Sequence, residues 1–252
     1  MTRNKDWRRH QLKRAWWMIE DNQEHIADAL YADLHRHRQE TYISDCALLQ
    51  NDILNTLQKL DDWTKDETPT KWDLVNFMGG TIVRKEPKGV ALIIGAWNFP
   101  ILLLLQPMIA AIAAGCAVIV KPSDMAPNVQ DLLLELLPQY LDRDAIRCIS
   151  AGPQEMSYIL EQRYDHIFYT GSANIGKIVH AAAAKHLTPT TLELGGLSPA
   201  IVTPNANIEL SAQHIASTKF QNAGQVRPSL YNIQPENKLT SLDLPQCKPR
   251  PR

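Results

Sequence analysis

Charged side chains are missing from a long stretch near the middle of the sequence. Between Gly89 and Val120 there is no Asp, Glu, Lys or Arg. A helix that spans a membrane needs about 20 consecutive apolar residues, whereas this stretch is interrupted by turn-forming and amide residues: Gly95, Asn98, Pro100, Gln106, Pro107 and Gly115. The interruptions argue against a membrane segment. They favour two buried strands, at 90–96 and 117–122, joined by a helix over 101–115.

An excess of charge of either sign is also missing. The 26 Lys and Arg residues balance 27 Asp and Glu residues, which leaves a net charge of −1. Nucleic acids and anionic membranes attract basic surfaces, so we expect neither as a main partner. The N-terminal residues are rich in charge and lack the apolar core of a signal peptide, so we expect a cytoplasmic protein.

Cysteine is scarce, and no two cysteines form a C-x-x-C pair. The four are far apart: Cys46, Cys116, Cys148 and Cys247. This spacing predicts neither a metal site nor a disulfide framework, and it favours a reducing compartment. Three histidines, His25, His35 and His37, lie among arginines in a helical region, and we interpret them as part of a solvated helix face rather than as metal ligands.

Apolar residues recur at helical spacing from Trp7 to about Lys65, which predicts N-terminal helices. A short edge strand is expected at 81–85, because charged residues stand at one end of it. From there strands and helices alternate. Besides those named above, strands are expected at 145–150, 166–170 and 190–194, and helices at 127–141, 153–163 and 173–186. This alternation predicts an α/β fold with a doubly wound parallel sheet.

Polar residues gather directly after four of the five strands expected in this sheet. They are Trp97 and Asn98 after the first strand, Lys121, Ser123 and Asp124 after the second, Gly171 and Ser172 after the fourth, and Glu193 and Leu194 with two glycines after the fifth. A doubly wound sheet binds its ligand at the carboxyl ends of its strands. The sequence therefore predicts a ligand site at this edge.

Each of these residues also has a plain structural interpretation. Backbone N–H groups at Gly171 and Ser172, with the dipole of the following helix, suit a pyrophosphate, and they equally suit a simple helix cap. Lys121 and Asp124 could hold ribose hydroxyls or form a surface ion pair. Glu193 could be a general base or a glutamate bonded to the backbone.

Five segments together carry a more specific signal: GAWNFP, AAGCAVIVKPSD, FYTGSANIGK, TLELGGLSP and KFQNAGQV. In this order and spacing they closely resemble the aldehyde dehydrogenase superfamily, in its class 3 or fatty-aldehyde branch, from about Trp7 to Val226. An ordinary Rossmann dehydrogenase would carry G-x-G-x-x-G after the first strand, and GAWNFP does not supply it. The resemblance implies oxidation of an aldehyde to a carboxylate, with hydride passed to NAD or NADP, and a homodimer.

The resemblance also implies a role for each matched residue. Two would serve catalysis: the Asn98 amide would donate to the oxyanion, and Glu193 would activate the water that hydrolyses the thioester. The others would hold the dinucleotide: Trp97 at the cleft, Lys121 at the adenine ribose with Ser123 and Asp124 beside it, Gly171 and Ser172 at the pyrophosphate, Gly176 in the packing of the following helix, and Leu194 near the nicotinamide. The family usually has glutamate where this sequence has Asp124, which leaves NAD and NADP both open.

The pattern breaks at the residue after KFQNAGQV, where the family has its nucleophilic cysteine and this sequence has Arg227. Aldehyde oxidation needs a thiolate that adds to the carbonyl carbon before the hydride leaves. A guanidinium stays protonated and is not a nucleophile. The other cysteines are poor substitutes, because a nucleophile must be held in near-attack geometry. We therefore expect this chain to be inactive in aldehyde oxidation.

Residues 227–252 contain five prolines, no glycine and no periodic apolar pattern, which is typical of a disordered tail. We interpret them as an abnormal end, from a retained intron, a frameshifted exon or a faulty gene model, with most of the family's catalytic domain missing. The expected parts are an N-terminal helical segment (1–68), an NAD(P)-binding α/β domain (69–196), the start of a catalytic domain (197–226) and the tail. The alternative function is that of a non-catalytic dinucleotide-binding or partner-interfering fragment.

Overall fold

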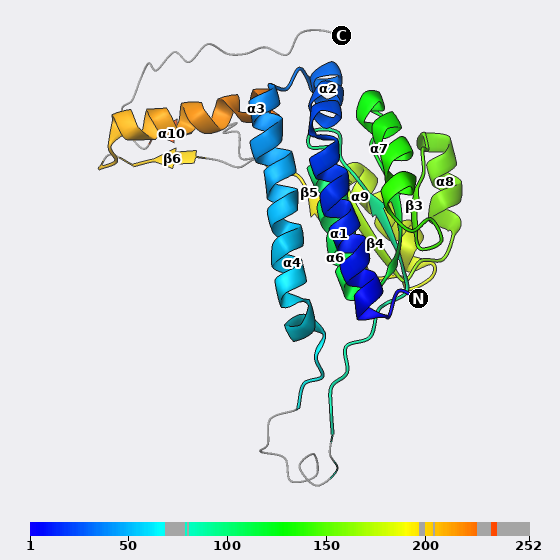
Figure 1. Cartoon of the computed structure of the whole chain (residues 1–252). Helices are drawn as coiled ribbons and strands as arrows, with labels where there is room; N and C mark the ends of the chain where they lie inside the picture. The colour runs from blue at the N-terminus through cyan, green and yellow to red at the C-terminus, as the bar shows by residue number, and fades with distance from the viewer. Residues whose placement is uncertain (69–78, 80, 197–199, 204, 226–232, 236–252) are drawn as a thin grey trace. The chain divides into compact units, whose positions relative to one another are not determined.

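Five parallel strands form the sheet around which residues 1–194 are built (Figure 1). They are β1 (Val90–Ile94), β2 (Ala117–Lys121), β3 (Ile146–Cys148), β4 (His166–Gly171) and β5 (Thr190–Leu194). Their order across the sheet is β3-β2-β1-β4-β5, so the chain builds outward from β1 in one direction and then returns to its other side. This arrangement confirms the predicted doubly wound sheet and puts its topological switch point between β1 and β4.

The computed structural model describes residues 1–68, 79, 81–196, 200–203, 205–225 and 233–235. The chain divides into two units, Met1–Leu194 and Gly195–Arg252. The helices of the first unit are α1 (Lys5–Asp21), α2 (Gln23–Leu34), α3 (Arg38–Thr41), the π-helix η1 (Tyr42–Ala47), α4 (Leu48–Thr64), α6 (Leu102–Ala114), α7 (Pro127–Tyr140), α8 (Pro153–Glu161) and α9 (Ala173–Ala184). None of the helices in the described part of the chain has the length and apolar character that crossing a bilayer requires.

The uncharged stretch supplies β1, α6 and β2, and β1 is buried on both faces. Ile93 packs into a core formed with α6, α7 and the N-terminal helices. Its neighbours Leu92 and Ile94 point to the other face and pack with residues of α8 and α9. A strand covered on both faces reads as a continuous apolar run rather than as an alternating one. This burial explains why the run between Gly89 and Val120 contains no charge.

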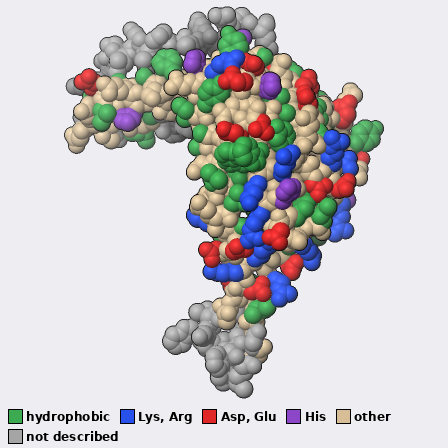
Figure 2. Space-filling model, viewed as in Figure 1, with side chains coloured by type: hydrophobic (Ala, Val, Ile, Leu, Met, Phe, Trp, Pro, Cys, Tyr) green, Lys and Arg blue, Asp and Glu red, His purple; other side chains and the backbone are tan. Residues whose placement is uncertain are grey.

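The N-terminal helices α1, α2 and α4 form an outer layer over α6 and α7 (Figure 1). Their inward side chains include several that are fully buried: Leu12, Ile19, Leu30, Leu49, Ile53 and Leu60. Figure 2 shows basic and acidic side chains interleaved over the outward face, where Arg9 pairs with Asp6 and, at 2.6 Å, with Asp61. These helices therefore share one core with the sheet. The domain boundaries expected after residues 68 and 196 stay predictions.

The prediction of an edge strand at 81–85 is wrong. Among the described residues Val83 pairs only with Glu67, through an isolated antiparallel bridge whose two backbone hydrogen bonds measure 2.8 and 3.0 Å. Both Ile82 and Val83 are about half exposed, so neither face of this segment is buried against a core. Without a buried face, a short β-branched run gains little from continuing the ladder.

The second unit holds two short parallel strands, β6 (Ala200–Val202) and β7 (Ile233–Pro235), with α10 (Ile208–Phe220) and the 3₁₀ turn η2 (Gln221–Gly224) between them in sequence. Asn207 caps α10 by accepting a 3.0 Å hydrogen bond from the Leu210 amide. Strand β7 lies inside the tail that was expected to be disordered. The remainder of that tail, with Arg227, lies outside the described residues.

The shared core predicts a sharp difference between two leucines of α4. Leu49 is fully buried, whereas Leu54 is 48% exposed. Leu49→Ala is expected to lower the free energy of unfolding by about 2–5 kcal/mol, because a buried cavity is left behind. Leu54→Ala, the matched control, is expected to change it by less than about 0.5 kcal/mol. Urea titration followed by circular dichroism measures both, and equal effects would contradict the placement of α4 in the core.

Candidate functional site

The predicted site residues lie at one edge of the sheet because four of its strands end within two residues of one another. The last residue of β1, Ile94, is in register with Lys121 of β2 and with Tyr169 of β4. On the other side of β4, Gly171 is in register with Leu194, the last residue of β5. The carboxyl ends of the four strands β2, β1, β4 and β5 therefore form a continuous edge that includes the switch point. Whether these residues bind or react stays a prediction.

The turn after β1 carries Trp97 and Asn98. Trp97 is 39% exposed, and Asn98 is half-buried. The backbone carbonyl of Asn98 accepts a 2.7 Å hydrogen bond from the guanidinium of Arg36. Arg36 lies between α2 and α3, sixty residues earlier in the chain, so the N-terminal helical segment takes part in building this edge of the sheet.

Lys121 and Asp124 form an ion pair at the end of β2. The ammonium of Lys121 is almost fully buried and lies 3.0 Å from the Asp124 carboxylate, which is half exposed. Burial acts to raise the pKa of Asp124, but the hydrogen bond and positive charge of Lys121 outweigh it and hold that pKa below its ordinary value. Ser123, also buried, accepts a 3.3 Å hydrogen bond from the Met125 amide. The pair thus places one buried cation and one accessible anion at the edge.

The connection from β4 to α9 is packed too closely for side chains at its glycines. A Cβ at Gly171 would lie 2.2 Å from the Tyr169 hydroxyl oxygen, and one at Gly176 would lie 2.8 Å from Cδ2 of Leu194. The Tyr169 hydroxyl donates to the Ser172 carbonyl at 3.2 Å. The Ser172 side chain caps α9 by accepting a long 3.4 Å bond from the Ile175 amide. The first turn of α9 is therefore brought directly against the strand end.

Glu193 and Leu194 end β5, and both are exposed. Glu193 is in register with Thr170 of β4. The Thr170 hydroxyl is buried and has no hydrogen-bond partner in the described residues. A buried hydroxyl without a partner is uncommon in folded proteins and calls for an explanation such as a bound water or ligand.

Two buried residues near this edge were missed by the sequence analysis. Arg36 is 3% exposed and Asp45 is fully buried, and they form an ion pair. The interpretation of the region around His35 and His37 as a solvated helix face is therefore wrong at Arg36. His35 ends α2 in a left-handed conformation and His37 caps α3, so the chain turns inward between them. Periodicity gave no signal for this turn, because the helix ends there.

The cysteines in the described residues are poorly suited to act as nucleophiles. Cys46 and Cys116 are buried. Burial raises the pKa of the Cys46 thiol to about 12, with further contributions from Asp45 and Glu20, and burial alone raises that of Cys148 to about 12. Since the thiolate is the reactive form, neither of these two supplies one near neutral pH. Whether any cysteine replaces the missing nucleophile stays a prediction.

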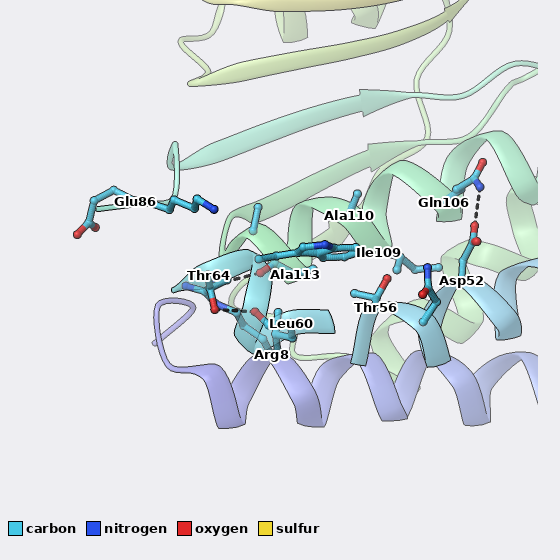
Figure 3. Close-up of a pocket in the computed structure, with 14 residues that line it drawn as sticks. Arg8, Asp52, Thr56, Leu60, Thr64, Glu86, Gln106, Ile109, Ala110 and Ala113 are labelled. Atoms are coloured by element: carbon cyan, nitrogen blue, oxygen red, sulfur yellow. Dashed lines mark hydrogen bonds between the residues drawn. The ribbon is translucent and has the colours of Figure 1, made fainter. Parts of the chain in front are cut away.

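A separate cavity of about 450 Å³ lies between α1, α4, α6 and residues 85–86 (Figure 3). At one end Gln106 donates to Asp52. At the other end the guanidinium of Arg8 donates to the Ala113 carbonyl at 3.1 Å. None of the predicted site residues lines this cavity, so it is distinct from the carboxyl edge of the sheet.

Comparison with known proteins identifies the lineage. A sequence model described as "Aldehyde dehydrogenase family" matches residues 3–229. The chain belongs to the aldehyde dehydrogenase family. It is 42% identical over 237 residues to aldehyde dehydrogenase family 3 member B1 of Homo sapiens. The aligned region covers 93% of this chain and 50% of that protein. It is also 42% identical to the dimeric, NADP-preferring aldehyde dehydrogenase of Canis lupus familiaris, over 89% of this chain and 49% of that protein.

Solved structures agree with this assignment to the aldehyde dehydrogenase family. The substrate-bound state of Staphylococcus aureus AldH matches with a TM-score of 0.90 and 36% identity, over 94% of this chain and 52% of that one. A Mycobacterium tuberculosis aldehyde dehydrogenase complexed with NAD⁺ matches with a TM-score of 0.77 at 24% identity, over 90% of this chain and 46% of that one, which shows the fold alone. The chain spans about half the length of the curated relatives it matches.

The Lys121–Asp124 pair predicts how the Asp124 carboxylate titrates. In the native chain Lys121 holds the pKa of Asp124 low. The pair therefore stabilises the fold at pH values above the pKa that Asp124 has in the unfolded chain. This stabilisation is lost as the pH falls through the lower pKa that Asp124 has in the folded chain. Lys121→Met is expected to raise the pKa of Asp124 above 3.8, because burial continues to disfavour the carboxylate. Carboxyl-detected NMR titration measures this change. Lys88→Met, at the opposite edge of the sheet, is the control and is expected to leave the Asp124 pKa unchanged.

Proposed function

We propose that the chain binds a pyridine dinucleotide, NAD or NADP, at the carboxyl edge of the sheet across the switch point between β1 and β4. The observation that carries this proposal is that four strands end within two residues of one another, which brings Lys121, Gly171 and Leu194 to one edge. Ligands of open α/β sheets bind at such an edge. Membership of the aldehyde dehydrogenase family supports the choice of ligand.

The arrangement at α9 fits a pyrophosphate. The first turn of a helix leaves N–H groups without intrahelical acceptors, and these groups with the helix dipole favour an anion. Gly171 and Gly176 let the first turn of α9 approach the strand closely. In this proposal Ser172 and the backbone around it hold the phosphates.

The arrangement at β2 fits a ribose. Lys121 supplies donors, and Asp124 supplies acceptors for hydroxyl groups. A free carboxylate at this position would favour the 2′-hydroxyl of NAD and repel the 2′-phosphate of NADP. Here the adjacent Lys121 compensates the charge of Asp124 at 3.0 Å, so the pair is compatible with either dinucleotide. Trp97 and Leu194, both partly exposed, would line the remaining apolar part of the cleft.

The chain is not proposed to oxidise aldehydes with these 252 residues. In the family's reaction the Asn98 amide would donate to the oxyanion and Glu193 would activate water, but both act on a carbon that a thiolate must first attack. Position 227 holds an arginine, and Cys46 and Cys148 have strongly raised pKa values. The bound dinucleotide would supply a hydride acceptor. The homodimer and the cytoplasmic location expected from the sequence stay predictions.

Calorimetric titration with NAD and with NADP tests the binding proposal. The wild-type chain is expected to bind at least one of them, and Lys121→Met is expected to weaken that binding about tenfold, which corresponds to ~1.4 kcal/mol. The matched control is Lys88→Met, because Lys88 is an exposed lysine just before β1 at the amino edge of the sheet. The absence of heat and of a thermal shift with both dinucleotides would overturn the proposal, as would equal effects of the two substitutions.

An aldehyde oxidation assay tests the proposed lack of activity. The purified chain is incubated with NAD or NADP and a series of short- and long-chain aldehydes, and formation of the reduced dinucleotide is followed by absorbance. No turnover above background is expected, because no thiolate is available to form the thioester. Turnover that Glu193→Ala removes would contradict this expectation, since it would mean that another group replaces the cysteine.

A further inference from the structure

A buried ion pair lies directly behind the turn that follows β1. Arg36 is 3% exposed and Asp45 is fully buried, and the Arg36 guanidinium donates to Oδ2 of Asp45. Taking both charges out of water costs several kcal/mol per ion, and it is compensated only when the geometry is good and further hydrogen bonds are made. An apolar pair could fill the same space, so stability alone does not account for these two residues.

Two further contacts of the Arg36 guanidinium reach this turn. It donates to the backbone carbonyl of Asn98 at 2.7 Å. Its central carbon lies 4.5 Å from the centre of the Phe99 ring, over the ring face. A charge-assisted hydrogen bond of this length is stronger than a neutral one, and the planar guanidinium can stack while it donates. Arg36 therefore fixes the peptide unit between Asn98 and Phe99.

Asp45 is the buried partner that holds the Arg36 guanidinium against this turn. Burial raises the pKa of Asp45 to about 6, while the charge and the hydrogen bond of Arg36 act to lower it. The other carboxylate oxygen, Oδ1, is buried and has no hydrogen-bond partner in the described residues. Asp45 itself lies in the π-helix η1, and single π-helical turns often mark functional positions in otherwise α-helical segments.

We infer that Arg36 and Asp45 are positioning residues that brace the turn between β1 and α6, and that they thereby fix the backbone from which Trp97 and Asn98 extend. Both residues belong to the N-terminal helical segment. That segment therefore covers α6 and α7 and also positions the turn that carries Trp97 and Asn98. The consequence for ligand binding rests on the proposed dinucleotide function. The bracing itself does not, because it is a property of the chain without ligand.

Hydrogen–deuterium exchange on the chain without ligand tests the bracing. Arg36→Met removes the charge and the hydrogen bonds of the guanidinium, including those to Asp45 and Asn98, while keeping an unbranched side chain. We expect exchange in residues 95–105 to rise about tenfold, with α7 and β3 changed little. Arg36→Lys keeps the charge but lacks the planar fork, so an intermediate rise is expected. Arg38→Met is the matched control, since Arg38 is two residues away and pairs with Glu24 and Asp28 at the surface.

The same variants are then titrated with NAD and with AMP. Arg36→Met is expected to bind NAD about tenfold more weakly and AMP with unchanged affinity, because AMP carries only the part of the ligand assigned to Lys121. Exchange that rises equally over the whole sheet, or stays unchanged in 95–105, would overturn the inference. If Arg36→Met does not fold, Arg36→Lys against Arg38→Met decides by the same criterion. Failure of the wild-type chain to bind both NAD and NADP would reject the proposed function and leave the exchange result to decide the bracing.

Discussion

The requirement that a parallel sheet be covered on both faces governs this structure. In β1 successive side chains enter different cores: Ile93 joins α6 and α7, while Leu92 and Ile94 join α8 and α9. A charge anywhere along this strand would be buried without a partner, at a cost that no neighbouring group could offset. The same requirement extends outward, because α6 and α7 are themselves covered by α1, α2 and α4. Within β1 and β2 charged groups are thereby confined to the strand end, at Lys121.

That confinement produces the candidate site. Four strands end within two residues of one another, so residues separated by about a hundred positions in the sequence, such as Asn98 and Glu193, lie at one edge. Close packing then shapes the edge: Tyr169 occupies the space that a side chain at Gly171 would need, and Leu194 occupies the space at Gly176. Lys121 is held in its buried position by the Asp124 carboxylate.

The family assignment and the residue at position 227 lead to different statements about function. The match over residues 3–229 places the chain among the aldehyde dehydrogenases, and the edge of the sheet keeps the family's matched residues. Arg227 removes the one group whose chemistry the others assist, because an oxyanion donor and a water-activating carboxylate act only after a thiolate has added to the aldehyde. Dinucleotide binding and aldehyde oxidation are therefore separable in this chain, and only the first is proposed for it.

The sequence by itself determined the α/β class, the strands of the sheet to within a few residues, and the family, because buried strands and strand-end motifs are local patterns with a fixed period. It did not reveal the Arg36–Asp45 pair, since charged residues in a helical region predict solvent, and only the inward turn between α2 and α3 buries them. It also suggested a strand at 81–85, because β-branched residues favour strands wherever a face can be buried, and no core lies against that segment. Tertiary structure decided these points, because burial and strand pairing depend on which distant segments meet.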